Sequence, residues 1–315
     1  MSKFNVALIG AGPTMEQYIK VLKYIKNPKI KLVGISSRTH LKAKKLQKKY
    51  KIKYFCKDID ELYKKTKADV LFSVVSVENI GKVSLKATKY PWKIFTEKPF
   101  GINYINNLKL IKNLKNKKKQ IFVGLNRAFL SSVLNLLKYL KNDKSKRIIN
   151  VFDQQDLSLF SDKKYSKDFK KNLMFSNSIH LFTIMKLVTR GNEISFKDIL
   201  NYKSKTEKFI IKKITFSSGD VVIFNSIWNR PGPWKIDIST SKNYFSLNPL
   251  EKLYVRPKNK KKNISIELSQ NDKKFKPGFK KQVEYFFNRV KNKQSLNFNF
   301  STELMKTIHS YFKSK

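Results

Sequence analysis

The sequence predicts an α/β domain with a doubly wound parallel sheet over residues 1–124, followed by an α+β domain with an open-faced, mainly antiparallel sheet over residues 125–315. Two observations predict this order. Short apolar runs alternate with segments of helical periodicity through the first domain, as in a parallel sheet with crossover helices. After Arg127, strand-like runs follow one another and are separated by turn signals such as Pro231-Gly232-Pro233, which favour antiparallel connections.

The first domain is expected to contain six strands, each a short apolar run that suits burial on both faces. These runs lie at residues 4–9, 30–35, 54–55, 68–75, 92–96 and 121–124. Helical stretches are expected after Gly12 and at residues 78–90 and 104–115, and Asp58 and Glu61 have the spacing of a capping box. Such a sheet binds its ligands beyond the carboxyl ends of the strands.

The second domain opens with an apolar stripe at helical spacing over residues 129–140. A strand over residues 146–160 and a long helix over residues 168–188 are expected next. Further strands are predicted at residues 208–216, 221–228, 234–240, 244–247 and 264–268. Helices over residues 278–290 and 301–312 close the chain.

A glycine turn follows the first expected strand, and it indicates a dinucleotide site. Gly10 can adopt a positive φ for a tight turn, and Gly12 lets the backbone approach a pyrophosphate at a helix N-terminus. Pro13 and Thr14 would open that helix. Met15 occupies the place of the third glycine in G-x-G-x-x-G. The glycine pair alone is also typical of an ordinary turn, so its position after a buried strand carries the prediction.

Composition limits the class of protein. A chain of 315 residues with 41% hydrophobic residues suits two domains with an ample core. No run of 18 apolar residues occurs and no signal-like segment opens the chain, which predicts a soluble, cytoplasmic protein with no membrane association. The single cysteine, Cys56, excludes an intramolecular disulfide and a cysteine-built metal site, and no metal is expected.

The formal net charge of +46 raises the question of nucleic-acid binding. Of the 68 basic residues, 61 are lysines, and they are scattered over every segment. Proteins that read bases or clamp phosphates favour arginine for its bidentate geometry. The sequence therefore disfavours specific nucleic-acid binding, and an anionic small-molecule substrate is the better use of the positive field.

Thr96-Glu97-Lys98-Pro99-Phe100-Gly101 stands at the end of the fifth expected strand, where a doubly wound sheet places its ligand. With this motif the sequence resembles the Gfo/Idh/MocA family of NAD(P)-dependent oxidoreductases, which includes enzymes like glucose–fructose oxidoreductase and inositol dehydrogenase. The resemblance rests on five places in order: Gly10-x-Gly12, Ser37-Arg38-Thr39, Glu97-Lys98-Pro99, Gly124-x-Asn126-Arg127-x-Phe129 and His180.

The resemblance implies a Rossmann domain that binds NAD(P) and a second domain that binds substrate and mediates a homo-oligomer, a dimer or a tetramer. It implies hydride transfer between nicotinamide and a hydroxyl or carbonyl carbon of a sugar, nucleotide sugar or polyol. The residues assigned to cofactor binding are Gly10, Gly12, Pro13, Thr14, Ser37, Arg38, Thr39, Ser76, Glu97, Lys98, Asn126 and Arg127. Those assigned to substrate binding are Lys98, Asn126, Ser176, Asn177 and His180.

The catalytic pair implied by the resemblance is Lys98 and His180. Lys98 would handle the hydroxyl proton, and Glu97 would orient its loop. For Arg127, an ion pair at the domain junction is an equal alternative to lining the cleft. Trp228, Arg230 and Trp234 would either bracket a sugar ring or belong to the sheet core or a subunit interface, and the second alternative is favoured.

His180 lies on one expected helix face with Ser176 and Thr183, and Asn177 is adjacent. The family pattern is D-x-x-x-H-x-x-D, so Ser176 stands in place of the first aspartate. A serine hydroxyl orients an imidazole more weakly than a carboxylate does. Asn177 or Ser178 would supply the orienting hydrogen bond instead. The alternative function is a non-catalytic, cofactor-binding sensor or scaffold of the same fold.

Cofactor choice depends on the end of the second expected strand. An acidic residue there would bind the ribose 2′-hydroxyl and repel a 2′-phosphate. This chain has Ser37-Arg38-Thr39, whose hydroxyls and guanidinium suit a phosphate. NADP(H) is therefore favoured, with NAD(H) as the alternative.

Overall fold

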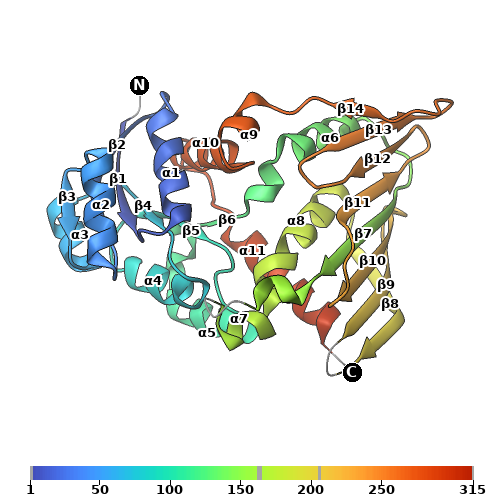
Figure 1. Ribbon diagram of the computed structural model, residues 1–315, viewed down its shortest axis with the longest axis horizontal. Coiled ribbons are helices and arrows are strands. Elements are labelled where there is room, and N and C mark those ends of the chain that lie inside the picture. Colours follow the sequence, from blue (N-terminus) through green and yellow to red (C-terminus); the bar gives the residue numbers. More distant parts are fainter. Residues whose placement is uncertain (1–2, 162–164, 205–206, 314–315) are drawn as a thin grey trace. The chain divides into compact units, whose positions relative to one another are not determined.

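The computed structural model describes residues 3–161, 165–204 and 207–313 (Figure 1). The chain forms two compact units. The first comprises the residues up to Leu125 together with Asn172–Ser176 and Phe279–Lys313, and the second comprises Asn126–Lys171 and Asn177–Gly278. Along the chain, the first passage from one unit to the other follows Leu125, next to the domain boundary predicted after residue 124.

The first unit is built on a six-stranded parallel sheet in the order β3-β2-β1-β4-β5-β6. Its strands are β1 (Lys3–Ile9), β2 (Lys29–Ser36), β3 (Tyr54–Cys56), β4 (Val70–Ser73), β5 (Lys93–Glu97) and β6 (Ile121–Gly124). The predicted doubly wound sheet is confirmed. The strand order reverses between β1 and β4, which makes the carboxyl ends of these strands the expected ligand-binding edge.

Five helices of the first unit alternate with its strands as predicted, and two more, which the sequence analysis assigned to the second domain, come from the last part of the described chain. They are α1 (Pro13–Tyr24), α2 (His40–Tyr50), α3 (Ile59–Thr66), α4 (Ile80–Ala87), α5 (Tyr104–Leu114), α10 (Phe279–Lys291) and α11 (Phe298–Phe312). The predicted cap is formed at α3, although Glu61 reaches back to the residue before the N-cap and not to Asp58 itself. The Asp58 carboxylate accepts from the backbone N–H groups of Asp60 and Glu61, and Glu61 accepts from the backbone N–H of Lys57 at 2.6 Å.

An aromatic cluster forms part of the core of the first unit. The Phe72 ring stacks on Phe95 with 4.5 Å between ring centroids, and Tyr18 stacks on Phe279 at 4.3 Å. Phe286 meets Phe95 edge-on at 5.5 Å. Phe279 and Phe286 belong to α10, so a helix from the end of the chain completes the hydrophobic core of the N-terminal sheet.

The second unit contains an eight-stranded sheet in the order β14-β13-β12-β11-β7-β10-β9-β8. Its strands are β7 (Ile148–Gln155), β8 (Glu193–Lys203), β9 (Lys208–Phe216), β10 (Val221–Trp228), β11 (Trp234–Ser239), β12 (Asn243–Leu247), β13 (Leu253–Pro257) and β14 (Ile264–Ile266). The neighbours β7 and β10 are parallel and the other pairs are antiparallel, which confirms a mainly antiparallel sheet.

Three details of the second unit differ from the expectation. Strands β8 and β13 were not foreseen; β8 is an exposed edge strand without a buried face. The expected strand over residues 146–160 ends at Gln155, since Asp156 caps a 3₁₀ turn over Leu157–Phe160. The expected long helix is divided into α7 (Lys167–Lys171), a π-helical turn over Met174–Ser178 and α8 (Ile179–Val188).

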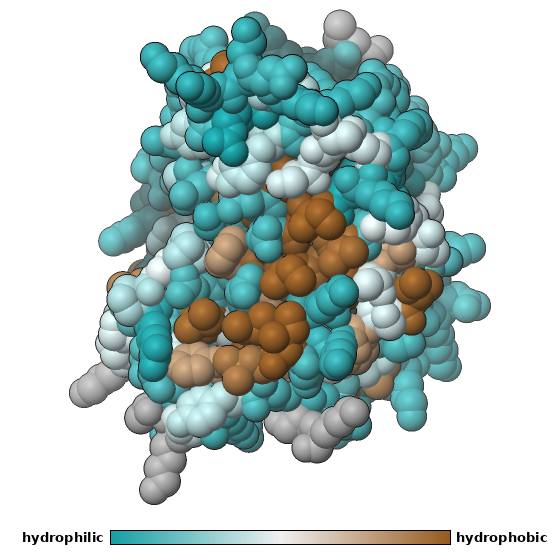
Figure 2. Space-filling model, turned by 90° about the vertical axis from the view of Figure 1, so that its right-hand side faces the viewer, coloured by the Kyte–Doolittle hydropathy of each residue, from teal (hydrophilic) through white to brown (hydrophobic). Residues whose placement is uncertain are grey.

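One face of this sheet is covered by helices and the other is open. In Figure 1, α6 (Ser131–Lys141) and α8 lie on one side of the sheet, and Phe182 of α8 packs on Phe224 of β10 at 4.9 Å. The remaining helix of this unit is α9 (Gln270–Lys274). Figure 2 shows hydrophobic side chains gathered on the uncovered face. Within the described ranges, no helix is long and apolar enough to cross a bilayer.

Candidate active site

The glycine turn between β1 and α1 has room for a phosphate group. Gly10 has a φ of +109°, and a Cβ atom there would lie 2.0 Å from the backbone oxygen of Val74. Gly12 is the N-cap of α1, and no side chain caps this helix end. A Cβ atom added to Gly12 would have no other atom within 4 Å. The first N–H groups of α1 therefore face open space at the positive end of the helix dipole, which fits a dinucleotide pyrophosphate.

The two glycines should respond differently to alanine. We expect Gly10→Ala to destabilise the first unit, because the side chain would meet the Val74 backbone and the residue would be held at a strained φ. Gly12→Ala should leave the melting temperature unchanged but weaken NADPH or NADH binding by about tenfold, since the new methyl group enters the phosphate space. Thermal melting and cofactor fluorescence titration test both. An equal loss of stability in the two variants would contradict this account.

The other residues predicted for the cofactor lie at carboxyl ends of strands. Ser37, Arg38 and Thr39 directly follow β2, and the Ser37 Oγ accepts from the Thr39 N–H at 3.3 Å. Arg38 is exposed and forms no ion pair within the described parts of the chain. Ser76 follows β4 and accepts from the Asn79 side-chain amide at 2.8 Å. Pro13 and Thr14 are the first residues of α1, as predicted from the glycine turn.

Glu97, the last residue of β5, is fixed by a buried pair of side chains. The Tyr18 hydroxyl donates to Glu97 Oε1 at 2.5 Å, and Gln282 Nε2 donates to the Tyr18 oxygen at 2.8 Å. Burial, reinforced by the Glu97 carboxylate, raises the pKa of Tyr18 well above its usual value, so the phenol keeps its proton. The sequence analysis missed this pair. Tyr18 lies on α1 and Gln282 on α10, and a contact between residues 264 positions apart leaves no local pattern in the sequence.

Lys98 follows β5 and donates from Nζ to the backbone carbonyl of Ser176, which belongs to the same unit. The Ser176 hydroxyl donates to the Leu173 carbonyl at 3.3 Å, and the side chain is buried. Ser176 therefore holds Lys98 through its main chain and uses its hydroxyl within its own turn.

In the second unit, His180 lies in the first turn of α8 and is 5% exposed. Its ring lies near-perpendicular to Trp234, with 6.4 Å between ring centroids. The Arg127 guanidinium lies 4.7 Å from the Trp234 ring centroid and forms a 2.5 Å ion pair with Glu251. Asn126, the neighbouring predicted residue, donates from its amide to the Pro277 carbonyl at 3.1 Å.

Asp153 is a buried polar residue that the sequence analysis missed. It lies on the covered face of β7, is 0% exposed, and its pKa is raised by burial although several hydrogen bonds oppose the shift. Its donors are Ser178 at 2.7 Å, Gln155 at 2.5 Å, Trp234 at 3.0 Å, Ser226 at 3.3 Å and Trp228 at 3.4 Å. The sequence did contain a sign of it: Asp153 alternates with the apolar residues at positions 149 and 151, so it shares their buried face of the strand.

Trp228 and Trp234 thus share one acceptor, and Arg230 does not join them. The Arg230 guanidinium pairs with Glu207 at 2.8 Å and lies over the Phe209 ring. Trp228 is 6% exposed, whereas Trp234 is partly exposed. The Trp234 ring lies near His180.

Comparison with known families decides the class of the first unit. Residues 4–125 match the model of an oxidoreductase family with an NAD-binding Rossmann fold. The Rossmann domain of this chain belongs to the Gfo/Idh/MocA family. The resemblance found from the motifs is confirmed for this part of the chain. No curated protein sequence matches the chain.

Solved structures of similar fold extend over both units. UDP-N-acetylglucosamine 3-dehydrogenase GnnA from Acidithiobacillus ferrooxidans aligns with a TM-score of 0.74 at 14% identity, over 99% of this chain and 97% of that one. A putative NADPH-dependent oxidoreductase from Desulfitobacterium hafniense gives 0.80 at 14% identity, over 98% and 94%. An oxidoreductase from Agrobacterium radiobacter in complex with NAD+, L-tartaric acid and magnesium gives 0.78 at 14%, over 99% and 96%.

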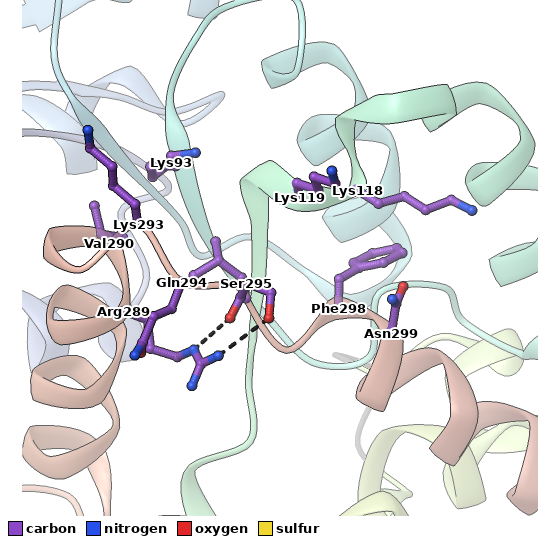
Figure 3. Close-up of a pocket in the computed structure, with 11 residues that line it drawn as sticks. Lys93, Lys118, Lys119, Arg289, Val290, Lys293, Gln294, Ser295, Phe298 and Asn299 are labelled. Carbon is purple, nitrogen blue, oxygen red and sulfur yellow. Dashed lines mark hydrogen bonds between the residues drawn. The ribbon is translucent and has the colours of Figure 1, made fainter.

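The Gfo/Idh/MocA domain also has a basic pocket of about 660 Å³ at the opposite edge of its sheet. The pocket includes Lys93, the first residue of β5, whereas Lys98 follows the last. Figure 3 shows Lys118 and Lys293 pointing in different directions and the Arg289 guanidinium turned toward Ser295. These cations do not converge on one point, so we assign the pocket no role in the active site. Among the described residues, no group of three or more His, Cys, Asp or Glu residues is placed to hold a metal ion.

Proposed function

We propose that this protein is an NAD(P)-dependent oxidoreductase that transfers a hydride between nicotinamide and a hydroxyl or carbonyl carbon of a sugar, nucleotide sugar or polyol. The observation that carries the proposal is the placement of Lys98. Its ammonium group lies just beyond β5, at the ligand-binding edge of a Rossmann sheet, next to a carboxylate that Tyr18 fixes in position.

The proposed chemistry assigns proton handling to this chain. Loss of a hydride from a carbinol carbon requires removal of the hydroxyl proton, and the reverse reaction requires its return. Bound NAD(P) supplies the hydride acceptor or donor. Lys98 would exchange the proton, and His180 would be the second acid–base group. The turn at Gly12 would hold the pyrophosphate, with Arg38 near the adenosine ribose.

Three observations support a sugar-like substrate. Trp234 offers an amphipathic ring near His180, and aromatic faces pack on the C–H surfaces of sugars. The net charge of +46 suits a substrate that carries an anionic group, such as the nucleoside diphosphate of a nucleotide sugar. One structural relative is named as a UDP-N-acetylglucosamine 3-dehydrogenase. UDP-N-acetylglucosamine is therefore the first substrate to test.

A homo-oligomer, a dimer or a tetramer, is proposed through the uncovered sheet face. Ile148, Leu200 and Tyr202 are 45%, 43% and 46% exposed, although all three are large and apolar or aromatic. They lie on strands of the sheet whose open face carries the hydrophobic side chains in Figure 2. Exposed apolar surface of this kind is typical of a protein interface.

A non-catalytic cofactor sensor is the second candidate function. The observation that favours it is Ser176, whose hydroxyl bonds to Leu173 and which replaces the carboxylate of the family pattern. A sensor would bind cofactor with normal affinity and would be indifferent to the loss of the Lys98 ammonium group. The Lys98 variant described in the Discussion separates the two functions.

We expect NADPH to bind more tightly than NADH, and Arg38→Ala to weaken NADPH binding by about tenfold while leaving NADH binding unchanged. A hydrogen bond from a guanidinium to a phosphate contributes roughly 1.5–3 kcal/mol. Fluorescence titration at near-physiological salt measures both affinities. Arg256→Ala removes an exposed arginine of the second unit and is the matched control. Tighter binding of NADH by the unaltered protein would contradict the role given to Arg38.

A further inference from the structure

Two pockets of the first unit meet at the 3₁₀ segment η2 (Lys115–Gln120). The first is the basic pocket of about 660 Å³ in Figure 3, to which η2 contributes Lys118 and Lys119. The second has a volume of about 590 Å³ and includes Lys115 and Lys117 of the same segment. Because Lys117 and Lys118 are neighbours in the chain, the two pockets adjoin. Together they form a groove along η2, the η2 groove.

The η2 groove carries positive charge that no carboxylate of its own neutralises. Eight of its described lining residues are lysine or arginine, and none of them is aspartate or glutamate. Within the described ranges, no ion pair involves Lys118, Lys119 or Lys293. By contrast, Lys49 of α2 pairs with Glu16 of α1 at 2.7 Å. The charge of the groove is therefore left for an external anion.

Arg289 adds to the groove a guanidinium whose printed hydrogen-bond acceptors are all neutral. Its Nε donates to the Ser295 carbonyl at 2.6 Å, and its Nη1 donates to the Tyr285 hydroxyl at 3.1 Å. The guanidinium also lies 5.5 Å from the centroid of the Tyr285 ring, which is 40% exposed. An exposed aromatic ring beside a cationic groove is typical of single-stranded nucleic-acid sites, in which bases stack on the ring and phosphates meet the cations.

The spread of the cations indicates the shape of the anion. Lys118 and Lys293 point in different directions, and the Arg289 guanidinium turns toward Ser295 (Figure 3). A compact anion, such as a single phosphate, would reach only some of these groups. A nucleic-acid strand carries one negative charge at every nucleotide, so it meets separated cations in turn. A bilayer surface is flat and would not follow two adjoining hollows.

We propose that the η2 groove binds single-stranded nucleic acid without sequence preference, through backbone phosphates and through stacking of a base on Tyr285. Lysine is a point charge without the planar fork that reads base edges, and the Arg289 fork is already bonded to Ser295 and Tyr285. The groove lies at the amino end of β5, whereas Lys98 follows its carboxyl end. The inference is therefore independent of hydride transfer, and its tests need neither cofactor nor sugar.

The first test compares two triple variants that lose the same charge, by the fluorescence anisotropy of a labelled strand of about 20 uridines. For the unaltered protein we expect a slope of about −3 in log affinity against log salt, the value for about four phosphate contacts. The groove variant, with Lys118→Gln, Lys119→Gln and Lys293→Gln, should bind at least about tenfold more weakly at about 50 mM salt and reduce the slope by about 2. The control variant replaces the exposed lysines at 260–262, before β14, with glutamine and should change the affinity by less than about threefold.

Equal losses in the two triple variants would assign the binding to the net charge of +46 alone and overturn the proposal. Absence of binding at about 50 mM salt would overturn it as well. A thymidine DNA strand of the same length should bind within about threefold of the RNA, because both present the same backbone charge, and a larger difference would contradict recognition of the backbone. The substituted lysines are exposed or half-buried, so both variants should fold, which thermal melting verifies.

The second test uses two other anions to separate the proposed ligand from the alternatives. At equal phosphate concentration, we expect tripolyphosphate to displace the labelled strand at least about tenfold less effectively than unlabelled oligouridine does. Equal displacement would indicate a site for a compact anion. Binding of phosphatidylserine vesicles that the groove variant loses, while that variant keeps its affinity for oligouridine, would make the groove a membrane contact. Either result would refute the nucleic-acid ligand.

The third test examines stacking with Tyr285→Leu, which removes the aromatic face and keeps an apolar side chain. The affinity for oligouridine should fall by about fivefold or more, the usual contribution of one stacked base, and the salt slope should stay the same because no charge is lost. Tyr139→Leu alters a tyrosine of α6 that is 44% exposed and is the matched control. Equal affinities of the two leucine variants would refute the stacking contact and the assignment to a single strand.

Discussion

Lys98→Met is expected to lower kcat/KM for hydride transfer by roughly 10²–10⁴-fold, the usual contribution of a general acid–base group. Methionine keeps much of the side-chain length but cannot exchange a proton. The Lys98 ammonium group also donates to the Ser176 carbonyl, so a small loss of stability is expected as well. Cofactor affinity should change little, because the glycine turn and Arg38 are untouched.

The measurement is NADPH formation or consumption in the presence of UDP-N-acetylglucosamine and then of other sugars and polyols. Lys93→Met is the matched control, since Lys93 is an exposed lysine at the other end of the same strand, β5. Full activity in Lys98→Met would show that another group handles the proton. Tight cofactor binding with no turnover in the unaltered protein would favour the sensor function.

Asp220→Asn is expected to lower the free energy of unfolding by about 3 kcal/mol, near the lower end for breaking a buried ion pair. The Asp220 carboxylate is 0% exposed and pairs with the Arg190 guanidinium at 2.5 Å. It also accepts from the backbone N–H groups of Arg147 and Arg190 at 3.0 Å. Because Arg190 is 27% exposed, its guanidinium partly regains water when the partner is lost, which keeps the effect below the maximum.

In the same variant, the free energy of unfolding should depend less on pH in the acid range. Burial alone would raise the pKa of Asp220, but hydrogen bonds from Arg190 and Arg147 lower it below the usual value. The unfolded chain therefore binds more protons, and this carboxylate stabilises the fold above the unfolded pKa of about 3.9. That contribution is lost as the pH falls through the lowered folded pKa.

Urea unfolding at pH 7 and at about pH 3 measures both effects. Glu267→Gln is the control, because Glu267 is 82% exposed in a 3.9 Å pair and should contribute less than about 0.5 kcal/mol. If Asp220→Asn and Glu267→Gln were equally stable at pH 7, the buried Asp220–Arg190 pair would not contribute the stability expected of it.

Local patterns predicted the first unit well. Its strands are short apolar runs, and residues a few positions apart form the helix cap at Asp58 and the glycine turn at Gly10. Strand β8 escaped prediction, since exposed edge residues lack a buried face and therefore lack alternation. The role of α10 also escaped, because its Phe286 packs on Phe72 of β4 and Phe95 of β5, which precede it by 214 and 191 positions.

The sequence by itself determined the alternation of strands and helices in the Rossmann domain, the Rossmann turn and the position of Lys98 at the end of a strand. These depend on the periodicity of neighbouring residues and on backbone preferences within one turn. Only the tertiary structure decided that the Ser176 hydroxyl faces its own turn and that Asp153 collects its donors. Ser178 and Trp234 are 25 and 81 positions from Asp153, and strand pairing and helix packing bring them to one carboxylate. No local sequence pattern predicts that these side chains share one acceptor, because their contact depends on the pairing and packing of segments far apart in the sequence.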